Sequence, residues 1–379
     1  MTNKNLMIIA GEISGDLHGA SLIKELKNLD QEINVYGIGG DKMKAAGMQL
    51  SYHINRMAFL GFVEVVRHLP FIKKVQRELL NLIRNMKIGT VVLIDYPGFN
   101  LSIAKKLKRL KVKIVYYISP QIWAWGSGRI RKIKKLVNKM LVVFPFEEKL
   151  YNNNNVNVEF VGHPLLEQLK HHKFLTKDKL FEKYELDKKR EILLILPGSR
   201  DQEVKHIFPE VIKAAVKLAK EFNLQIVTAC SSNIDEKMFN EITEEKEFKI
   251  IKNDTYNLLK HSGFGIVKSG TSTLEAGLFQ LPMVIVYKTS GLTYWIGRSL
   301  VKVDLIGMAN IISGEKVVPE LIQNQVSKEM VYKESKKILS DKNLYQAIKN
   351  KFGLIKEKLG EEGASVKAAE SIYKIMNET

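Results

Sequence analysis

The sequence contains one cysteine, Cys230, at the end of the mostly apolar run 224–230. A single thiol excludes a framework of intramolecular disulfides, and it excludes a zinc site built from cysteines. We expect this side chain to be buried as a small apolar group. We also expect the protein to work in a reducing compartment, which favours the cytoplasm.

Long apolar segments are also missing. No run of about 18 apolar residues occurs, and no apolar core of signal-peptide length precedes the first strand-like segment. The sequence therefore predicts neither a membrane-spanning helix nor an exported protein. A hydrophobic content of 45% and a charged content of 26% are those of a soluble globular protein, and 379 residues favour two domains.

The chain lacks the common phosphate and metal signatures. It has no Walker or dinucleotide-binding fingerprint, no Asp-x-Asp pair, and no set of His, Asp and Glu at metal-ligand spacing. We therefore expect no metal and no cofactor. Any phosphate that the protein binds must then be neutralised by its own cations and N–H groups.

Acidic residues are too few to balance the basic ones, and the net charge is +18. Residues 105–139 contain twelve Lys or Arg and no Asp or Glu. Phosphorylated metabolites, anionic lipid and nucleic acid all fit such a charge, as does a lysine-rich composition without a function. A nucleic-acid binder would use Trp123 and Trp125 beside this run, but no nucleic-acid motif is present and strand residues interrupt the basic run.

Short strand-like segments alternate with amphipathic helical patterns along the chain. This rhythm predicts an α/β fold with parallel sheets covered on both faces, arranged as two Rossmann-like, doubly wound domains. The predicted strands are 6–10, 35–38, 91–94, 114–118, 141–144, 158–161, 192–196, 225–229, 249–251, 264–267 and 283–287.

A polar, lysine-rich stretch at 165–190 separates the two halves. We expect an N-terminal domain at 1–165 and a C-terminal domain at 166–340. Only helical pattern follows, and we expect the helices of 341–379 to cross back toward the N-terminal domain or a partner subunit. In parallel sheets, ligands bind beyond the carboxyl ends of the strands, so the strand-end loops of the two domains would together line a cleft.

Two strand-to-helix junctions stand out in the second half. Segment 192–196 runs into Pro-Gly-Ser-Arg at 197–200, and segment 265–267 runs into Lys-Ser-Gly-Thr at 268–271. A helix N-terminus has unpaired N–H groups and a partial positive charge, which suit an anion. Glycine lets a ligand approach the backbone, and Ser or Thr adds a hydroxyl donor. Ordinary turns are the alternative, but two junctions that each carry a basic residue favour phosphate binding.

Two charged side chains beside these junctions have two interpretations each. Arg200 could present its guanidinium to a phosphate, or it could form a surface pair with Asp201 or Glu203. Glu275 could accept hydrogen bonds from ribose hydroxyls, or it could be a first-turn acid favoured by the helix dipole.

In the first half, Asp95 follows the apolar segment 91–94 and precedes a Pro-Gly turn. A carboxylate at that place suits a general base, although it could instead bond turn amides or cap the next helix. Glu12 and Asp16 are the next candidates, and Asp16 could equally cap its own helix. The position of His163 between Gly and Pro favours a structural role in a turn. We expect its ring to be packed inside the protein.

The stretch 57–86 combines a thick apolar side with basic residues. Such a helix can lie in a membrane interface, and the alternative is a helix that faces the core. The candidate membrane contacts are Phe62, Val66, Phe71 and Lys74.

These segments together resemble the lipid-A-disaccharide synthase family. The motifs match in order over about 6–325, and the ordered set is more specific than any single motif. They read AGEISGD at 10–16, DYPGFN at 95–100, SPQIWAW at 119–125, FVGH at 160–163, LPGSR at 196–200, SGTSTLE at 269–275, LVKVD at 300–304 and MANIISG at 308–314.

The resemblance implies an inverting, metal-independent enzyme of the GT-B fold. It would join UDP-2,3-diacylglucosamine to 2,3-diacylglucosamine 1-phosphate, giving a β-1,6 disaccharide 1-phosphate and UDP. It would lie on the cytoplasmic face of the inner membrane as a peripheral protein, with no nucleic-acid partner, and family members can form homodimers. Another UDP-sugar enzyme of this fold stays open, such as a UDP-N-acetylglucosamine epimerase or a glycosyltransferase on lipid-linked sugars.

The resemblance also gives each candidate residue a role, with Asp95 as the base. The implied donor-site residues are Arg200, Ser269, Gly270, Thr271, Glu275 and Asn310. The implied acceptor or cleft residues are Glu12, Ser14, Gly15, Gln121 and Trp123. In one departure from some family members, Gly98 stands where they carry a second acid, so Asp95 is the only acid in its motif.

Overall fold

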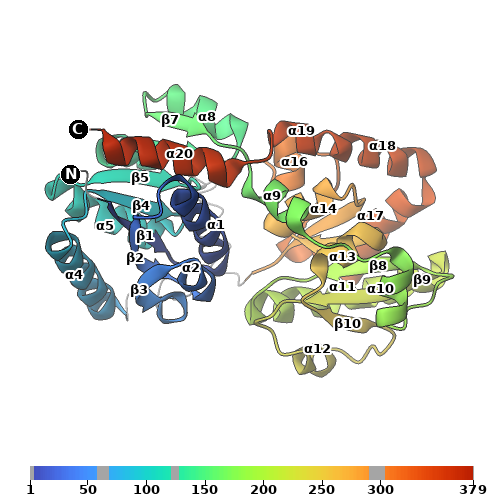
Figure 1. Ribbon diagram of the computed structural model, residues 1–379. Helices are drawn as coiled ribbons and strands as arrows, with labels where there is room; N and C mark the ends of the chain where they lie inside the picture. Colours follow the sequence, from blue (N-terminus) through green and yellow to red (C-terminus); the bar gives the residue numbers. More distant parts are fainter. Residues whose placement is uncertain (1–3, 58–67, 121–127, 290–303, 379) are drawn as a thin grey trace. The chain divides into compact units, whose positions relative to one another are not determined.

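The computed structural model describes residues 4–57, 68–120, 128–289 and 304–378 (Figure 1). The chain forms two compact units, Met1–Lys170 with Leu359–Thr379, and His171–Lys358.

The first unit is built on a seven-stranded parallel sheet in the order β3-β2-β1-β4-β5-β6-β7. This is the doubly wound order, which reverses direction between β1 and β4. The strands are β1 (Asn5–Ala10), β2 (Asn34–Gly39), β3 (Met48–His53), β4 (Thr90–Ile94), β5 (Lys113–Tyr117), β6 (Lys139–Val142) and β7 (Val158–Phe160).

Helices cover both faces of this sheet because its central strands are apolar on both sides. The buried side chains of α4, α5 and α7 form one hydrophobic cluster with one face, while α1 and α20 pack together on the other. The helices are α1 (Ile13–Leu29), α2 (Asp41–Ala45), α4 (Leu69–Asn85), α5 (Pro97–Arg109), α7 (Gly128–Leu136), α8 (Pro145–Asn152), α9 (Pro164–His171) and α20 (Ala364–Asn377), with η1 (Ile54–Arg56).

The second unit repeats this plan with six parallel strands in the order β10-β9-β8-β11-β12-β13, which reverses between β8 and β11. The strands are β8 (Glu191–Leu196), β9 (Leu224–Cys230), β10 (Lys249–Lys252), β11 (Ser262–Lys268), β12 (Met283–Tyr287) and β13 (Glu320–Ile322). The helices are α10 (Lys177–Lys183), α11 (Asp201–Phe222), α12 (Lys237–Glu241), α13 (Thr255–His261), α14 (Thr271–Leu278), α16 (Met308–Ser313), α17 (Lys328–Ser340), α18 (Lys342–Gly353) and α19 (Ile355–Lys358), with η2 (Gln323–Gln325).

The predicted α/β fold with two Rossmann-like sheets is confirmed, and each predicted strand is present. Two strands were missed, β3 and β13, and each forms the edge of its sheet. An edge strand is covered less completely, so its sequence need not be a continuous apolar run. Cys230 is buried as expected, with 1% of its surface exposed.

The C-terminal helix α20 belongs to the first unit, whereas α17, α18 and α19 belong to the second. At its start, the Glu167 carboxylate accepts the N–H of Ser365 at 2.8 Å and so replaces a capping side chain. At its end, the Lys113 ammonium donates to the carbonyls of Ile375, at 3.0 Å, and Glu378. Both ends of α20 are therefore held by polar side chains of the first unit.

Candidate functional site

In the first unit, the loops that follow β1 and β4 meet where the strand order reverses. The ring of Tyr96 packs directly on the backbone of Gly11, because a Cβ at Gly11 would lie 2.3 Å from that ring. The Tyr96 hydroxyl also donates to the Met57 carbonyl at 2.8 Å. Glycine is thus required at position 11, and the Asp95 loop is locked against the loop that begins α1.

The backbone at Asp95 is strained. Asp95 and Tyr96 have φ angles of 42° and 44°, in the left-handed region, and such a residue costs about 1–3 kcal/mol. The Asp95 carbonyl accepts hydrogen bonds from the Asn100 side chain at 2.7 Å and from the Tyr116 hydroxyl at 2.5 Å. These bonds fix the turn. Strain that is held in place in this way concentrates at functional sites.

The Asp95 carboxyl group is poised to exchange a proton near neutral pH. Burial, together with the negative charge of Glu12, raises its pKa from 3.8 to about 7, although a hydrogen bond from the Tyr96 N–H opposes the rise. No described cation forms an ion pair with it within 4.0 Å. A partly buried carboxylate with this pKa suits a general base, as its position in the sequence predicts.

Of the other first-unit candidates, some are exposed at the start of α1 and one is buried against β1. Glu12 and Ser14 are exposed at the start of α1. Gly15 is buried, and a Cβ there would lie 3.1 Å from the Ala10 Cβ, so glycine lets α1 approach β1 closely. Gln121 and Trp123 lie outside the described residues, and their predicted roles stay predictions.

Two further polar candidates stabilise the backbone of the first unit. The Asp16 carboxylate accepts the N–H groups of Gly40 at 2.6 Å and Met43 at 3.0 Å, so it caps α2 rather than its own helix. The expected turn role of His163 is confirmed, because its buried ring accepts the Leu165 N–H at 3.1 Å. Burial lowers the pKa of His163 to about 3, so it stays neutral.

In the second unit, the predicted β11–α14 junction offers free donors. Gly270 precedes α14 with a φ of 152°, where glycine is favoured. No described residue accepts a hydrogen bond from the N–H groups of Gly270, Thr271 or Ser272. The Ser269 hydroxyl donates to the Ile306 carbonyl at 2.7 Å, which fixes the loop just before the helix. The start of α14 therefore has the arrangement expected of an anion site.

The β8–α11 junction is organised around Glu203, a residue that sequence reasoning considered only as a pair for Arg200. One carboxylate oxygen accepts the Ser199 N–H at 3.1 Å, and the other contacts the Lys268 ammonium at 2.7 Å. Gly198 is needed here, because a Cβ at that position would lie 2.5 Å from the carboxylate. Glu203 thereby joins the two junctions across the point where the strand order reverses.

Arg200 lies at the same edge, at the N-cap of α11. Its guanidinium is 3.8 Å from the Glu203 carboxylate, so the pairing that was the alternative interpretation is present. The contact is long and the Arg200 side chain is 50% exposed. A pair of this kind is weak, and it leaves the guanidinium able to turn to a ligand.

Glu275 lies one turn into α14 and is partly buried. Burial raises its pKa from 4.5 to about 7 despite the opposing effect of a hydrogen bond from the Tyr256 hydroxyl, at 3.4 Å. Among the described residues, no cation pairs with Glu275 within 4.0 Å. Tyr256 was missed by sequence reasoning, because nothing in a lone tyrosine at the start of α13 indicates contact with α14.

Asn310 is connected to the α14 junction through buried hydrogen bonds. Its buried carboxamide donates to the Val318 carbonyl and to Glu320, both at 2.9 Å, and accepts the Val318 N–H at 3.1 Å. Glu320 in turn accepts the Ile306 N–H at 2.8 Å. Because the Ile306 carbonyl holds the Ser269 hydroxyl, Asn310 is connected to the α14 junction through the 306–307 loop. Its role at a bound donor stays a prediction.

The outer surface of α4, α5 and α7 is strongly basic. Val75, Leu79 and Ile83 of α4 are buried in the core, which is the core-facing interpretation of this helix. Phe71 is partly buried and Lys74 is exposed, whereas Phe62 and Val66 lie outside the described residues. The exposed basic side chains of this layer are Lys73, Lys74, Arg77, Arg84, Lys105, Lys108, Arg109, Arg129, Arg131, Lys132, Lys134 and Lys135.

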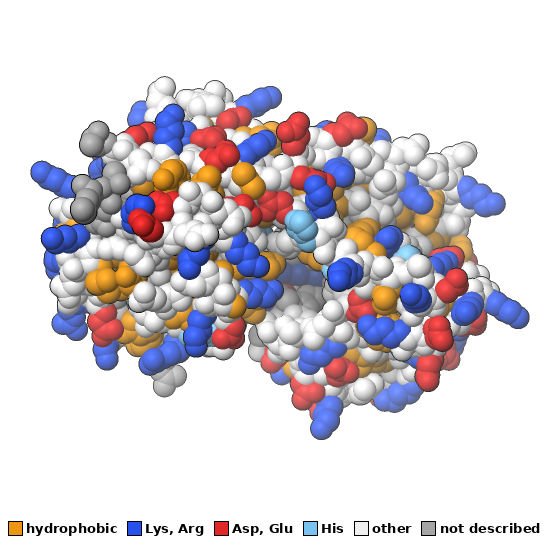
Figure 2. Space-filling model, in the orientation of Figure 1, with side chains coloured by type: hydrophobic (Ala, Val, Ile, Leu, Met, Phe, Trp, Pro, Cys, Tyr) orange, Lys and Arg blue, Asp and Glu red, His pale blue; other side chains and the backbone are white. Residues whose placement is uncertain are grey.

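We call these twelve side chains the basic layer. The only acid on the three helices is Glu78. Lys and Arg side chains also project from the left-hand edge of the face drawn in Figure 2, where Figure 1 places α4. None of the described helices is long and apolar enough to cross a membrane.

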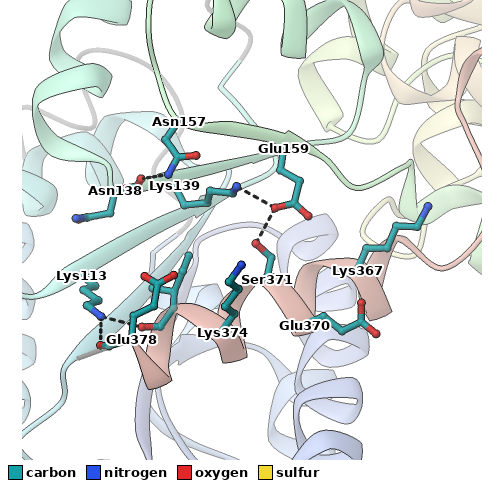
Figure 3. Close-up of a pocket in the computed structure, with 11 residues that line it drawn as sticks. Lys113, Asn138, Lys139, Asn157, Glu159, Lys367, Glu370, Ser371, Lys374 and Glu378 are labelled. Carbon is teal, nitrogen blue, oxygen red and sulfur yellow. Dashed lines mark hydrogen bonds and ion pairs between the residues drawn. The ribbon is translucent and has the colours of Figure 1, made fainter.

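One pocket, of about 500 Å³, lies away from these strand ends. It is formed by α20 and by the amino ends of β5, β6 and β7 (Figure 3). Several of its polar groups bond within the first unit: Glu159 pairs with Lys139 at 3.0 Å and accepts the Ser371 hydroxyl at 2.9 Å, and Lys113 donates to main-chain carbonyls of α20 and the residue after it. This pocket therefore lies where α20 packs on the first sheet. None of the candidate residues line it.

Comparisons with known proteins agree with this arrangement. The family model of lipid-A-disaccharide synthetase matches residues 6–376. A lipid-A-disaccharide synthase of Geobacter metallireducens is 38% identical over 99% of this chain and 98% of its own length. One from Coxiella burnetii is 36% identical over 99% of this chain and 100% of its own.

Solved structures with the same fold are more distant in sequence. A UDP complex of Staphylococcus aureus MnaA has a TM-score of 0.68 at 16% identity, covering 98% of this chain and 97% of the other. The calicheamicin glycosyltransferase CalG4 has a TM-score of 0.62 at 12% identity, covering 99% and 98%. These likenesses show the two-domain GT-B fold. With the family match over nearly the whole length, they establish that the chain belongs to the lipid-A-disaccharide synthases, which are glycosyltransferases.

Proposed function

We propose that the enzyme transfers the sugar of UDP-2,3-diacylglucosamine to the 6-hydroxyl of 2,3-diacylglucosamine 1-phosphate. The products would be the β-1,6 disaccharide 1-phosphate and UDP, with inversion at the anomeric carbon. The observation that carries this proposal is the Asp95 carboxyl group, which a strained turn holds at the carboxyl edge of the first sheet with a pKa of about 7. Family membership supplies the substrate class.

The second unit would hold the donor. The free N–H groups at the start of α14 and the guanidinium of Arg200 would bind the diphosphate, and Glu275 would accept hydrogen bonds from the ribose. Ser269, Gly270 and Thr271 would contact the phosphates. As the bond to UDP breaks, negative charge grows on the diphosphate, and these oriented donors stabilise it. Two solved structures of this fold hold such ligands: the S. aureus MnaA complex holds UDP, and a UDP-GlcNAc 2-epimerase of Neisseria meningitidis holds UDP-GlcNAc.

The first unit would supply the base. In an inverting transfer, the acceptor oxygen forms its bond to the anomeric carbon while the bond from that carbon to UDP breaks. The proton of the acceptor hydroxyl passes to the Asp95 carboxylate, and the electron pair of the broken bond leaves with UDP. Near neutral pH a substantial fraction of Asp95 is ionised, and its raised pKa makes it a stronger base than an ordinary aspartate. Glu12, Ser14 and Gly15 would line the acceptor side.

A direct assay tests this proposal. The enzyme is incubated with both acylated sugars in the presence of a metal chelator, and UDP and a disaccharide phosphate are measured. We expect both products in equal amounts. Turnover of UDP-N-acetylglucosamine without acceptor, with no disaccharide from the acylated pair, would instead indicate an epimerase of the same fold.

The pH dependence of kcat/KM should follow the ionisation of the Asp95 carboxyl group. Because its pKa is raised to about 7, the carboxylate forms only as the pH rises through neutrality, and kcat/KM should rise over the same range. Glu12→Gln removes a negative charge that raises this pKa, so the acidic limb of the profile should move to lower pH. Glu12 does not contribute to the raised pKa of Glu275, so the shift identifies Asp95. An acidic limb that does not move would contradict the assignment.

We also propose that the basic layer binds the anionic surface of the inner membrane from the cytoplasmic side, where acylated substrates reside. Sedimentation with vesicles should show binding to anionic lipid that weakens with added salt, and little binding to zwitterionic lipid. Replacing Lys105, Lys108 and Arg109 by Gln should reduce the bound fraction several-fold. The matched control replaces Lys213, Lys217 and Lys333 of the second unit and should bind as the wild type. Equal loss in both triple variants would refute a specific surface.

A further inference from the structure

We infer that Lys268 is an additional donor-binding residue, whose ammonium contacts the diphosphate of the nucleotide sugar and is held in place by Glu203. This inference rests on the proposed function, because it assumes that the second unit binds a UDP-sugar. The sequence shows Lys268 only as the basic residue of its junction, and neither the family motif at 269–275 nor the comparisons give this side chain a role.

Lys268 lies directly beside the start of α14. It is the last residue of β11 and directly precedes Ser269, so its backbone leads into the junction that offers free N–H groups. Its Nζ atom lies only 3.7 Å from the place where a Cβ on Gly270 would be. Since Gly270 is the N-cap of α14, the ammonium lies beside the end of the helix where an anion would bind.

The Lys268 ammonium has hydrogen-bond donors to spare. Its Nζ contacts one Glu203 oxygen at 2.7 Å, and an ammonium group has three hydrogen-bond donors. No other described side chain or carbonyl accepts from it. The Lys268 side chain is 18% exposed, so the remaining donors have restricted access to water. A diphosphate on the α14 N-terminus would supply the missing acceptors.

Glu203 explains how the ammonium is kept in place. Its carboxylate is 16% exposed and is itself fixed by the Ser199 N–H at 3.1 Å. The cluster of Lys268, Arg200 and Glu203 carries one net positive charge, so the carboxylate does not cancel the attraction for a diphosphate. Glu203 is therefore a positioning residue, because it acts on the ligand through Lys268. The alternative is that Lys268 and Glu203 form an internal ion pair with no contact to the nucleotide.

Calorimetric titration of the full-length enzyme with UDP and with uridine separates these alternatives. Uridine carries the same base and ribose but no phosphate. For Lys268→Met, we expect UDP affinity to fall about 10-fold or more, as for a lost charge-assisted hydrogen bond, and uridine affinity to change less than about two-fold. Lys268→Arg should restore most of the UDP affinity. The control Lys333→Met removes an exposed lysine of α17 and should bind both ligands as the wild type.

Each other result has a distinct meaning. If the wild type binds UDP and Lys268→Met binds it equally well, the inference is overturned while the proposed function stands. If Lys268→Met is folded by circular dichroism but loses UDP and uridine to the same extent, Lys268 is structural and the inference is again overturned. If the folded wild type binds neither UDP nor the UDP-sugar, the proposed function itself fails.

Discussion

Asp95→Asn should lower turnover by about 100-fold or more, because the variant cannot accept the proton of the attacking hydroxyl. The amide has nearly the same size, and the strained turn is held through the Asp95 carbonyl, which the substitution leaves in place. We therefore expect unchanged folding and unchanged UDP affinity. The measurements are kcat with both acylated sugars and a UDP titration by calorimetry.

The stability of this variant provides an independent check. The raised pKa of Asp95 means that the unfolded chain loses this proton at lower pH than the folded protein, so ionising Asp95 destabilises the fold as the pH rises from about 4 to 7. Asp95→Asn should then be at least as stable as the wild type at pH 8. The control is Asp41→Asn, at an exposed carboxylate of the same unit, which should keep full activity. A fully active Asp95→Asn enzyme would remove Asp95 from the mechanism.

Arg200→Ala should weaken donor use about 10- to 100-fold in kcat/KM, because the guanidinium would bind the diphosphate and stabilise the charge that develops as UDP leaves. Arg200→Lys should recover only part of this loss, since an ammonium cannot form the paired hydrogen bonds of a guanidinium. The measurement varies the UDP-sugar at saturating acceptor.

Lys213→Ala is the matched control for this test. Lys213 is an exposed cation of the same helix, and its own pairing with Glu210 is long, at 3.8 Å. Its kinetics should be those of the wild type. If Arg200→Ala also shows unchanged donor dependence, Arg200 is only the surface partner of Glu203, and the donor site must be assigned to other cations.

The sequence was sufficient to predict the central strands, because strands such as β4 and β8 are apolar on both faces and are bounded by turn residues. The position of Asp95 could be predicted for the same reason, since it directly follows β4. Its strained backbone and its interaction with Glu12 could not. The turn is fixed by hydrogen bonds from Asn100 and Tyr116. The packing of Tyr96 against Gly11 brings together the loops that carry Asp95 and Glu12, which are distant in the chain.

Contacts between distant residues account for most of what was missed at the site. Lys268 and Glu203 are 65 residues apart, and only the strand order that places β11 beside β8 brings them together. In the sequence, Asp16 is either a candidate catalytic acid or a cap for its own helix, but the parallel pairing of β1 with β2 brings α2 within its reach. Asn310 was assigned through a family motif, whereas its burial and its bonds to Val318 and Glu320 require the folded structure.

If the second unit holds the nucleotide by the N-terminus of α14, a crystal structure of the enzyme with UDP should show it. We expect the diphosphate within hydrogen-bond distance of the Gly270 and Thr271 N–H groups, with Arg200 beside it and the ribose hydroxyls on Glu275. UDP bound elsewhere, with the α14 junction occupied only by solvent, would contradict it.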